Sequence, residues 1–248
     1  MTATPRTVHV EPCMGTVFTI DIRDPGPWDG AVADAVGWLH HVDAVFSTYK
    51  EGSDISRLRR GELAVGDADP DVAPVLALCE RLADETGGWF TAWWGAGLDP
   101  TGLVKGWAVE RASERLAAHG SRNHAVNGGG DVQLAGEAAP GRPWSVGIAD
   151  PFDRGRILAT VSGRGLAVAT SGTAERGAHI VDPHTRAPAR GLASVSVVGP
   201  SLTRADAYAT AAFARGPEAL GWIAGVPGYE ALLVLPGARV VATPGLAA

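Results

Sequence analysis

The sequence predicts an α+β fold, with a mostly antiparallel sheet as its core and helices flanking that sheet. Helix-like segments concentrate before residue 120, whereas most strand-like segments, separated by turns, follow it. Strands and helices do not alternate regularly, as they would in a doubly wound parallel fold. The 248 residues are enough for a sizeable core, and no linker or internal repeat marks a boundary. We therefore expect one domain over residues 1–248.

The first part of the chain is expected to form one strand and then three helices. Residues 17–22 alternate in the manner of a half-buried strand. A helix that starts at Asp29 would carry Val32, Val36, Leu39 and Phe46 toward a core. Further helices are expected over about 70–85 and 103–119, because apolar residues recur at helical spacing there and glycines follow both stretches.

The second part is expected to supply most of the sheet. Predicted strands cover residues 124–127, 131–135, 144–149, 157–161, 166–170, 179–181 and 194–198. An alanine-rich helix over 202–214 and a short one over 217–224 come next. The strands 230–235 and 239–242 close the chain, with a Pro-Gly turn between them.

Composition excludes several classes of protein. Hydrophobic residues make up 46% and charged residues 19%, as in folded globular proteins. The net charge is -6 and Lys and Arg are not clustered, so a nucleic-acid partner is not expected. Neither a membrane span nor a leader pattern is visible, which predicts a cytoplasmic protein. Cys13 and Cys79 lack the spacing of a metal site and are expected to be small apolar fillers.

The pair Asp206 and Thr210 is the most informative feature of the sequence. Residues four apart on a helix lie on the same side, so this carboxylate and hydroxyl can converge on one cation. Oxygen ligands suit Mg²⁺, which keeps its remaining positions for phosphate and water. An alternative is that Asp206 is a surface residue and Thr210 bonds its own backbone.

Three further stretches carry groups suited to a ligand. Glycines beside Lys105 at an expected helix start suit an anion, although an ordinary turn fits equally well. Three consecutive glycines between Asn127 and Asp131 exceed what a hairpin needs, so either a ligand lies on bare backbone or the stretch is a simple turn. Thr170 and Ser171 end a strand and could form a polar wall.

Other candidate residues have both a functional and a structural interpretation. His179 titrates near neutrality and could act as an acid or a base, with Asp182 nearby, but a lone histidine is more often structural. Met14 and Tyr49 could pack on a flat ring, or could belong to the core.

Together these stretches resemble the ApbE family, the FAD:protein FMN transferases. The resemblance extends from Met14 to about Gly216. The matching stretches, in chain order, are Met-Gly-Thr, Phe-Ser-Thr-Tyr with Ser-Asp-Ile-Ser-Arg, Asp-Pro-Thr-Gly-Leu-Val-Lys-Gly, Asn-Gly-Gly-Gly-Asp, Ala-Thr-Ser-Gly, His-Ile-Val-Asp-Pro and Ala-Asp-Ala-Tyr-Ala-Thr-Ala. Where the family often has an asparagine after the Ser-Asp-Ile-Ser-Arg stretch, this chain reads Leu58-Arg-Arg60.

The resemblance implies a T-fold-like structure with an FAD cleft and a Mg²⁺-dependent reaction; Mn²⁺ would also accept oxygen ligands. Family members move FMN from FAD to a Thr or Ser hydroxyl of an acceptor flavoprotein with a flavinylation-type motif, and AMP is released. The implied metal ligands are Asp206, Thr210 and the Gly102 carbonyl. The implied FAD contacts are Met14, Tyr49, Lys105, Asn127, Asp131, Thr170 and Ser171. His179 would take the hydroxyl proton and Asp182 would orient it.

Two other functions remain open from the sequence. The same metal site with water as the nucleophile would make the protein an FAD pyrophosphatase that releases FMN and AMP. A protein that only binds FAD, as a carrier or sensor, is the other, and the retained Asp206, Thr210 and His179 argue against it. Trp89, Trp93 and Trp94 could shape the cleft wall or belong to the core.

Overall fold

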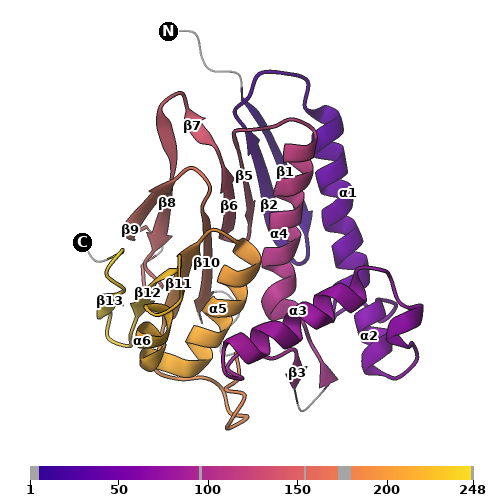
Figure 1. The fold of residues 1–248 in the computed structure, drawn as a ribbon, viewed down its shortest axis with the longest axis vertical. Coiled ribbons are helices and arrows are strands. Elements are labelled where there is room, and N and C mark those ends of the chain that lie inside the picture. Colours follow the sequence, from indigo (N-terminus) through magenta and orange to yellow (C-terminus); the bar gives the residue numbers. More distant parts are fainter. Residues whose placement is uncertain (1–5, 95–96, 154, 173–179, 247–248) are drawn as a thin grey trace.

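The computed structural model describes residues 6–94, 97–153, 155–172 and 180–246 (Figure 1). Its main sheet has eight strands in the order β1-β2-β5-β6-β10-β11-β12-β13, and neighbouring strands pair antiparallel. Their bounds are Thr7–Cys13, Thr16–Ile22, His124–Gly128, Asp131–Ala135, Ala167–Gly172, Ser194–Gly199, Glu230–Val234 and Val240–Ala242. The predicted α+β class with an antiparallel core is confirmed.

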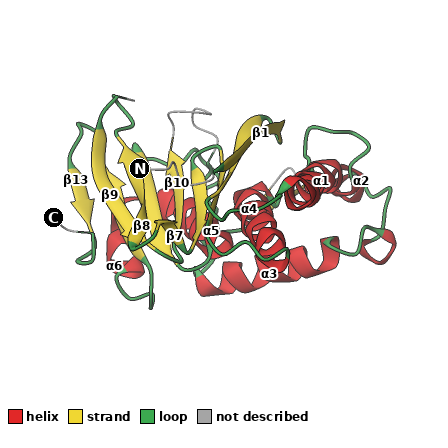
Figure 2. Ribbon diagram, turned by 90° about the horizontal axis from the view of Figure 1, so that it is seen from above, coloured by secondary structure: helices red, strands yellow, loops and turns green. Residues whose placement is uncertain are grey.

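Helices cover one face of this sheet, and a smaller sheet covers part of the other (Figures 1 and 2). Helices α4 and α5 contact each other and the central strands, and α1 packs on α4. The helices are α1 Asp29–Phe46, α2 Asp54–Arg59, α3 Val72–Glu85, α4 Thr101–Ala118, α5 Leu202–Arg215 and α6 Ala219–Ile223, with the 3-10 turns η1 Val65–Asp67 and η2 Gly216–Glu218. None of the helices among the described residues combines the length and apolar character needed to cross a bilayer.

The smaller sheet consists of β7 Glu137–Ala139, β8 Arg142–Ala149 and β9 Ile157–Gly163. Ile148 and Val161 of this sheet bury Val168 and Val198 of the main sheet, and Trp144 packs with Leu134. A short hairpin, β3 Trp93–Trp94 and β4 Gly97–Leu98, precedes α4. The result is three layers, with the main sheet buried between helices and a second sheet.

Several features of the fold differ from the sequence expectations. Strand β1, helix α2 and strand β7 were not predicted, because β1 and β7 lie at sheet edges with weak apolar patterns and α2 has only six residues. The strand predicted over 179–181 is wrong for its described residues, since Val181 forms only an isolated bridge with Pro188. Two backbone hydrogen bonds flank this bridge, from the Ala189 N–H to the Ile180 carbonyl and from the Asp182 N–H to the Ala187 carbonyl, both at 2.9 Å.

Both cysteines are buried thiols, as the sequence indicated. Burial raises the pKa of Cys13 to about 11 and that of Cys79 to about 12. Neither thiol is therefore ionised near neutral pH, and neither is a candidate nucleophile.

His124 is a fully buried imidazole that we expect to make the fold acid-sensitive. Its Nδ1 and Nε2 lie 2.9 Å and 2.8 Å from the hydroxyls of Ser121 and Ser113. Burial lowers its pKa from 6.5 to about 4. Because the unfolded chain binds this proton more readily, about 3 kcal/mol of stability should be lost as the pH falls from about 6.5 to about 4.

Urea unfolding at several pH values measures this loss. The variant His124→Asn should start less stable at pH 7 but should show a shallower decline in unfolding free energy over the same pH range. Equal declines in both proteins would contradict the assignment of the acid sensitivity to His124.

Candidate functional site

A cavity of about 1080 Å³ opens at one end of the main sheet. Loops, helices and strands far apart in the sequence line it together. The lining residues include Met14, Thr16, Ser47, Tyr49, Lys50, Asp99, Thr101, Gly102, Lys105, Gly129, Gly130, Ile148, Pro151, Thr170, Ser171, Ser194, Asp206 and Thr210. This cavity therefore contains most of the stretches that the sequence singled out.

The pairing of β6 with β10 ends where the cavity begins. The two strands pair at only two positions, Ala167 with Gln133 and Val168 with Val132. Beyond them, the side chain of Asp131 spans the gap, and its Oδ1 accepts a hydrogen bond from the Thr170 N–H at 3.0 Å. Helices α4 and α5 line the cavity on one face of the sheet, and β8 lines it on the other face.

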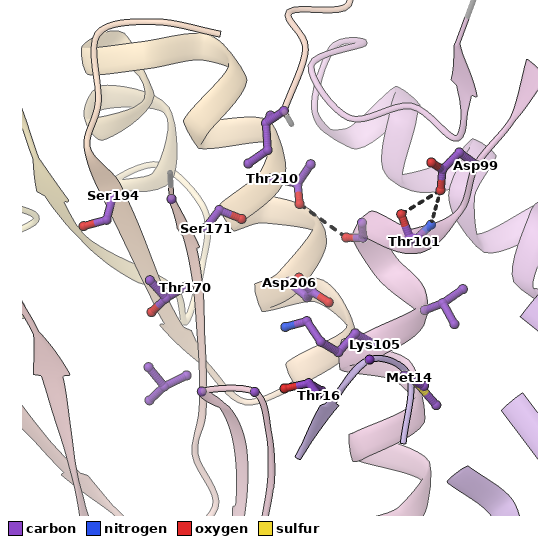
Figure 3. A pocket seen from close by; sticks show the side chains of 18 of the residues that line it. Met14, Thr16, Asp99, Thr101, Lys105, Thr170, Ser171, Ser194, Asp206 and Thr210 are labelled. Carbon is purple, nitrogen blue, oxygen red and sulfur yellow. Dashed lines mark hydrogen bonds between the residues drawn. The ribbon is translucent and has the colours of Figure 1, made fainter. Parts of the chain in front are cut away.

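The candidate cation site lies where α5 packs on α4 (Figure 3). The Thr210 hydroxyl lies 3.4 Å from the Gly102 carbonyl oxygen, and it donates to that carbonyl of the neighbouring helix. Asp206 Oδ2 accepts a hydrogen bond from the Gly106 N–H at 2.8 Å. Asp206 is only 6% exposed, so it is not a surface residue. The structure thus brings Gly102, Asp206 and Thr210 to one wall of the cavity.

Two glycines on α4 make this approach possible. A Cβ on Gly106 would lie 2.7 Å from both the Asp206 Cβ and the Leu202 carbonyl oxygen. A Cβ on Gly102 would lie 3.3 Å from two Thr210 side-chain atoms. The sequence therefore contains a second pair spaced by four, Gly102 and Gly106. Across the helix interface, Gly102 lies against Thr210 and Gly106 lies against Asp206.

The start of α5 is fixed by buried and partly buried polar contacts that no sequence pattern predicted. Glu110 on α4 accepts hydrogen bonds from the Ser201 hydroxyl at 2.9 Å and the Thr203 N–H at 2.7 Å, and also from the Thr203 hydroxyl. The Leu202 N–H donates to Gln133 Oε1 at 3.1 Å. Because these bonds satisfy groups in the first turn, they set the position of α5 and hence of Asp206.

The donor set suits a hard divalent cation. It comprises a carboxylate, a hydroxyl and a backbone carbonyl, all of them oxygen. Mg²⁺ prefers such ligands and is commonly held by few protein groups together with water and substrate phosphate. The residues present therefore fit the ion that the sequence analysis expected.

Lys105 supplies positive charge beside these oxygens. Its ammonium group forms an ion pair with Asp131, whose side chain is 1% exposed, while the Lys105 side chain is 22% exposed. In Figure 3, Lys105 lies next to Asp206 on the cavity wall. The first residues of α4, Thr101 and Gly102, also line the cavity, so the positive end of a long helix faces it.

The triple glycine has a structural explanation for each position. Gly129 and Gly130 have φ angles of 61° and 96°, which form the tight turn. A Cβ on Gly128 would lie 2.6 Å from the Phe18 ring. Asn127 accepts a hydrogen bond from the Gly130 N–H at 3.0 Å, and it does not belong to the described residues that line the cavity. Gly129 and Gly130 do line it, so bare backbone faces the cavity.

The hydroxyl side chains of β10 and β11 that line the cavity point to opposite faces of the sheet. In Figure 3, Ser171 points toward α5, whereas Thr170 and Ser194 point to the other face of the sheet. This follows from the alternation of side chains along a strand. Thr170 Oγ1 lies 2.7 Å from the hydroxyl of Ser196 on β11, which fixes its orientation.

Met14 and Tyr49 reach the cavity from two tight turns. Met14 and Gly15 have φ angles of 50° and 69° in the two-residue turn between β1 and β2. Tyr49 is 90% exposed and therefore does not belong to the core. Its loop is held by Ser47, whose carbonyl accepts the hydroxyls of Ser53 and Ser56 at 2.5 Å and 3.2 Å.

The predicted acid–base pair is placed only in part. His179 lies outside the described residues. Asp182 is not one of the described residues that line the cavity, and its carboxylate accepts the N–H of His184 at 2.8 Å and the hydroxyl of Thr185 at 2.9 Å. Desolvation raises the pKa of Asp182, but these hydrogen bonds outweigh it and the pKa is lowered. In the structure Asp182 therefore stabilises a turn, and its role toward His179 stays a prediction.

Asp99 and Thr101 are lining residues that the sequence analysis did not assign. Asp99 Oδ1 accepts the Thr101 N–H at 3.0 Å and the Thr101 hydroxyl at 2.6 Å (Figure 3). An aspartate just before a helix is a recognisable signal for such a contact, so this pair could have been found from the sequence.

Known proteins resemble this chain in sequence and in fold. The sequence model of the ApbE family matches residues 14–96 and 93–233. The FAD:protein FMN transferase of Rhodobacter capsulatus is 38% identical over 236 residues, covering 91% of this chain and 42% of that protein. That of Treponema pallidum is 36% identical over 171 residues, covering 61% of this chain and 47% of that protein. The chain thus spans less than half the length of these two relatives.

Solved structures show the same fold. The ApbE protein of Thermotoga maritima is 22% identical with a TM-score of 0.86, and the alignment covers 97% of this chain and 98% of that one. The flavin transferase ApbE of Vibrio cholerae is 21% identical with a TM-score of 0.83, covering 97% of both chains.

Proposed function

Because the chain belongs to the ApbE family, we propose that it moves FMN from FAD to a threonine or serine hydroxyl of an acceptor flavoprotein, with Mg²⁺. In this proposal residues 1–248 act as one flavin transferase domain. The observation that carries it is the meeting of the Asp206 carboxylate, the Thr210 hydroxyl and the Gly102 carbonyl at the wall of a large cavity, beside Lys105. A cavity of about 1080 Å³ has room for a ligand of dinucleotide size.

The reaction exchanges one P–O bond for another. The acceptor hydroxyl attacks the phosphorus on the FMN side of FAD, the bond to the AMP oxygen breaks, and the hydroxyl proton passes to a base, for which His179 is our candidate. When bound between Asp206, Thr210 and Gly102, Mg²⁺ would neutralise charge on the diphosphate oxygens.

The chain's own residues would position the diphosphate. Lys105 and the N-terminus of α4 offer positive charge to the phosphates, and Asp131 holds the Lys105 ammonium in place. Gly129 and Gly130 let the ligand approach bare backbone. Positioning and charge compensation of this kind supply most of the rate in phosphoryl transfer.

Mass spectrometry tests the proposal directly. Incubation with FAD, Mg²⁺ and a threonine-bearing acceptor peptide should add one FMN phosphoryl unit to the peptide and release AMP. Release of free FMN and AMP without an acceptor would instead favour a pyrophosphatase. Intact FAD after prolonged incubation with Mg²⁺ would favour a protein that only binds FAD.

Removing the charge of Lys105 should weaken FAD binding. We expect Lys105→Met to raise the dissociation constant for FAD by about 10- to 100-fold, since hydrogen bonds to charged groups contribute about 1.5–3 kcal/mol. Asp131→Asn should have a smaller effect. The asparagine side-chain oxygen can still accept the hydrogen bond from the Thr170 N–H, and only the ion pair with Lys105 is lost. Quenching of flavin fluorescence measures both affinities.

Arg111→Gln is the matched control for these variants. Arg111 lies on the same helix with a side chain 55% exposed and paired to Glu114. Its loss should leave FAD affinity unchanged. Equal weakening by Arg111→Gln and Lys105→Met would show that net charge, and not the Lys105 ammonium, is responsible.

A further inference from the structure

Thr101 presents a hydroxyl group to the cavity at the first position of α4. Thr101 is exposed, it lines the cavity, and it directly precedes Gly102, whose carbonyl is a proposed metal ligand. Consecutive Cα atoms are about 3.8 Å apart, so Thr101 lies close to the phosphates of a ligand bound at that carbonyl. The chain therefore has a threonine of its own at the place where the proposed reaction occurs.

A carboxylate holds this hydroxyl group. Asp99 also lines the cavity, and its Oδ1 accepts the Thr101 hydroxyl at 2.6 Å and the Thr101 N–H at 3.0 Å (Figure 3). The Asp99 N–H in turn donates to the carbonyl of the buried Ala92 at 2.7 Å. A hydroxyl within hydrogen-bond reach of a base that is itself held in place is the arrangement of an activated nucleophile.

Other hydroxyls of the cavity have different partners. The Thr210 hydroxyl donates to the Gly102 carbonyl, and the Thr170 hydroxyl lies 2.7 Å from that of Ser196. Neither a carbonyl nor a hydroxyl takes up a proton near neutral pH, whereas an ionised carboxylate such as that of Asp99 can do so. Thr101 is therefore better placed than Thr170 or Thr210 to act as a nucleophile.

Thr185 has the same kind of partner away from the cavity. It is exposed, and its hydroxyl donates to Asp182 Oδ2 at 2.9 Å. Neither residue belongs to the described residues that line the cavity. Thr185 is therefore an internal control, because it shares the carboxylate partner of Thr101 but not its position beside the proposed metal ligand.

We propose that Thr101 is an internal acceptor of FMN, so that the chain flavinylates itself. The inference rests on the proposed transferase function and uses the same exchange of bonds. The Thr101 hydroxyl oxygen bonds to the phosphorus on the FMN side of FAD, and the bond from that phosphorus to the AMP oxygen breaks. The hydroxyl proton passes to the Asp99 carboxylate, AMP leaves, and FMN stays on the chain as a phosphodiester.

Mass spectrometry of the chain itself tests this inference. The protein is incubated with FAD and Mg²⁺, with and without the threonine-bearing acceptor peptide, and its mass is compared with that of its sequence. Trypsin then releases residues 82–105, which contain Thr101, and residues 177–186, which contain Thr185. Fragmentation of these peptides locates the modified residue. Without acceptor peptide, we expect one FMN phosphoryl unit per chain, on Thr101.

Four variants separate the roles of the hydroxyl and the carboxylate. Thr101→Val should remove the modification, and Thr101→Ser should retain it, since serine keeps the hydroxyl. Asp99→Asn should slow it about 10²-fold, because the amide oxygen can still accept both hydrogen bonds but cannot take the proton. Thr185→Val should be modified as fast as the wild type.

The outcomes distinguish this inference from the proposed function. An unmodified chain together with a flavinylated peptide would overturn the inference and leave the transferase proposal standing. Modification of Thr185 or of any residue other than Thr101 would also overturn it, and an unchanged rate in Asp99→Asn would overturn the role of the carboxylate. Modification of Thr101 without transfer to the peptide would support the internal acceptor and contradict transfer to another protein. Intact FAD throughout would contradict both.

Discussion

Replacing Asp206 with asparagine is expected to lower FMN transfer by about 10²–10³-fold, the loss typical when a group that stabilises transition-state charge is removed. The amide oxygen can still accept the hydrogen bond from the Gly106 N–H, so the packing of α5 on α4 should persist. What is lost is the negative charge of a carboxylate that is 6% exposed at the cavity wall. Binding of Mn²⁺, measured by electron paramagnetic resonance, should weaken together with activity.

Two comparisons give this prediction its specificity. Asp67→Asn changes an exposed aspartate of η1 and should alter neither turnover nor Mn²⁺ binding. His179→Ala should cost less activity than Asp206→Asn, because phosphoryl transfer depends more on charge compensation and positioning than on a base. Unchanged Mn²⁺ affinity in Asp206→Asn would show that the Asp206 carboxylate does not bind the metal.

The sequence predicted which residues of α5 share one side better than it predicted the contacts that hold α5 in place. Spacing by four on an alanine-rich helix placed Asp206 and Thr210 on one side, and that local rule holds in the structure. The family resemblance added Gly102, which lies about 100 residues away in the chain and adjacent in space. Local patterns cannot show which distant helix the Asp206 carboxylate and the Thr210 hydroxyl will face. The assignment of the Gly102 carbonyl therefore needed the family resemblance.

Other features depended on tertiary contacts that no local pattern reveals. A glutamate on a helix is usually exposed to solvent, yet Glu110 accepts hydrogen bonds from the Ser201 hydroxyl and the Thr203 N–H at the start of α5. The glycine run 128–130 suggested either a ligand on bare backbone or a simple turn. Gly129 and Gly130 form the turn and line the cavity, whereas Gly128 is required by the Phe18 ring. Tyr49 and Trp93 could equally have been core residues by composition, and only their burial distinguishes the two cases.

Replacing Gly106 with alanine is expected to damage both the fold and the proposed cation site. The new Cβ would lie 2.7 Å from the Asp206 Cβ and from the Leu202 carbonyl oxygen, and backbone cannot rotate out of the way. Helices α4 and α5 must then move apart, at a cost of about 1–3 kcal/mol in unfolding free energy, typical of overpacked cores. The same movement would separate Asp206 and Thr210 from Gly102, so Mn²⁺ affinity should fall as well.

Gly37→Ala provides the opposite result in the same protein. Gly37 is also a mid-helix glycine, but it lies exposed on α1 and a Cβ there would meet nothing within 4 Å. Alanine should therefore stabilise the protein by about 0.5–1 kcal/mol through its helix propensity. Urea unfolding of both variants measures the contrast. If Gly106→Ala were as stable as Gly37→Ala and kept its Mn²⁺ affinity, close packing of α4 on α5 would not be what assembles the proposed cation site.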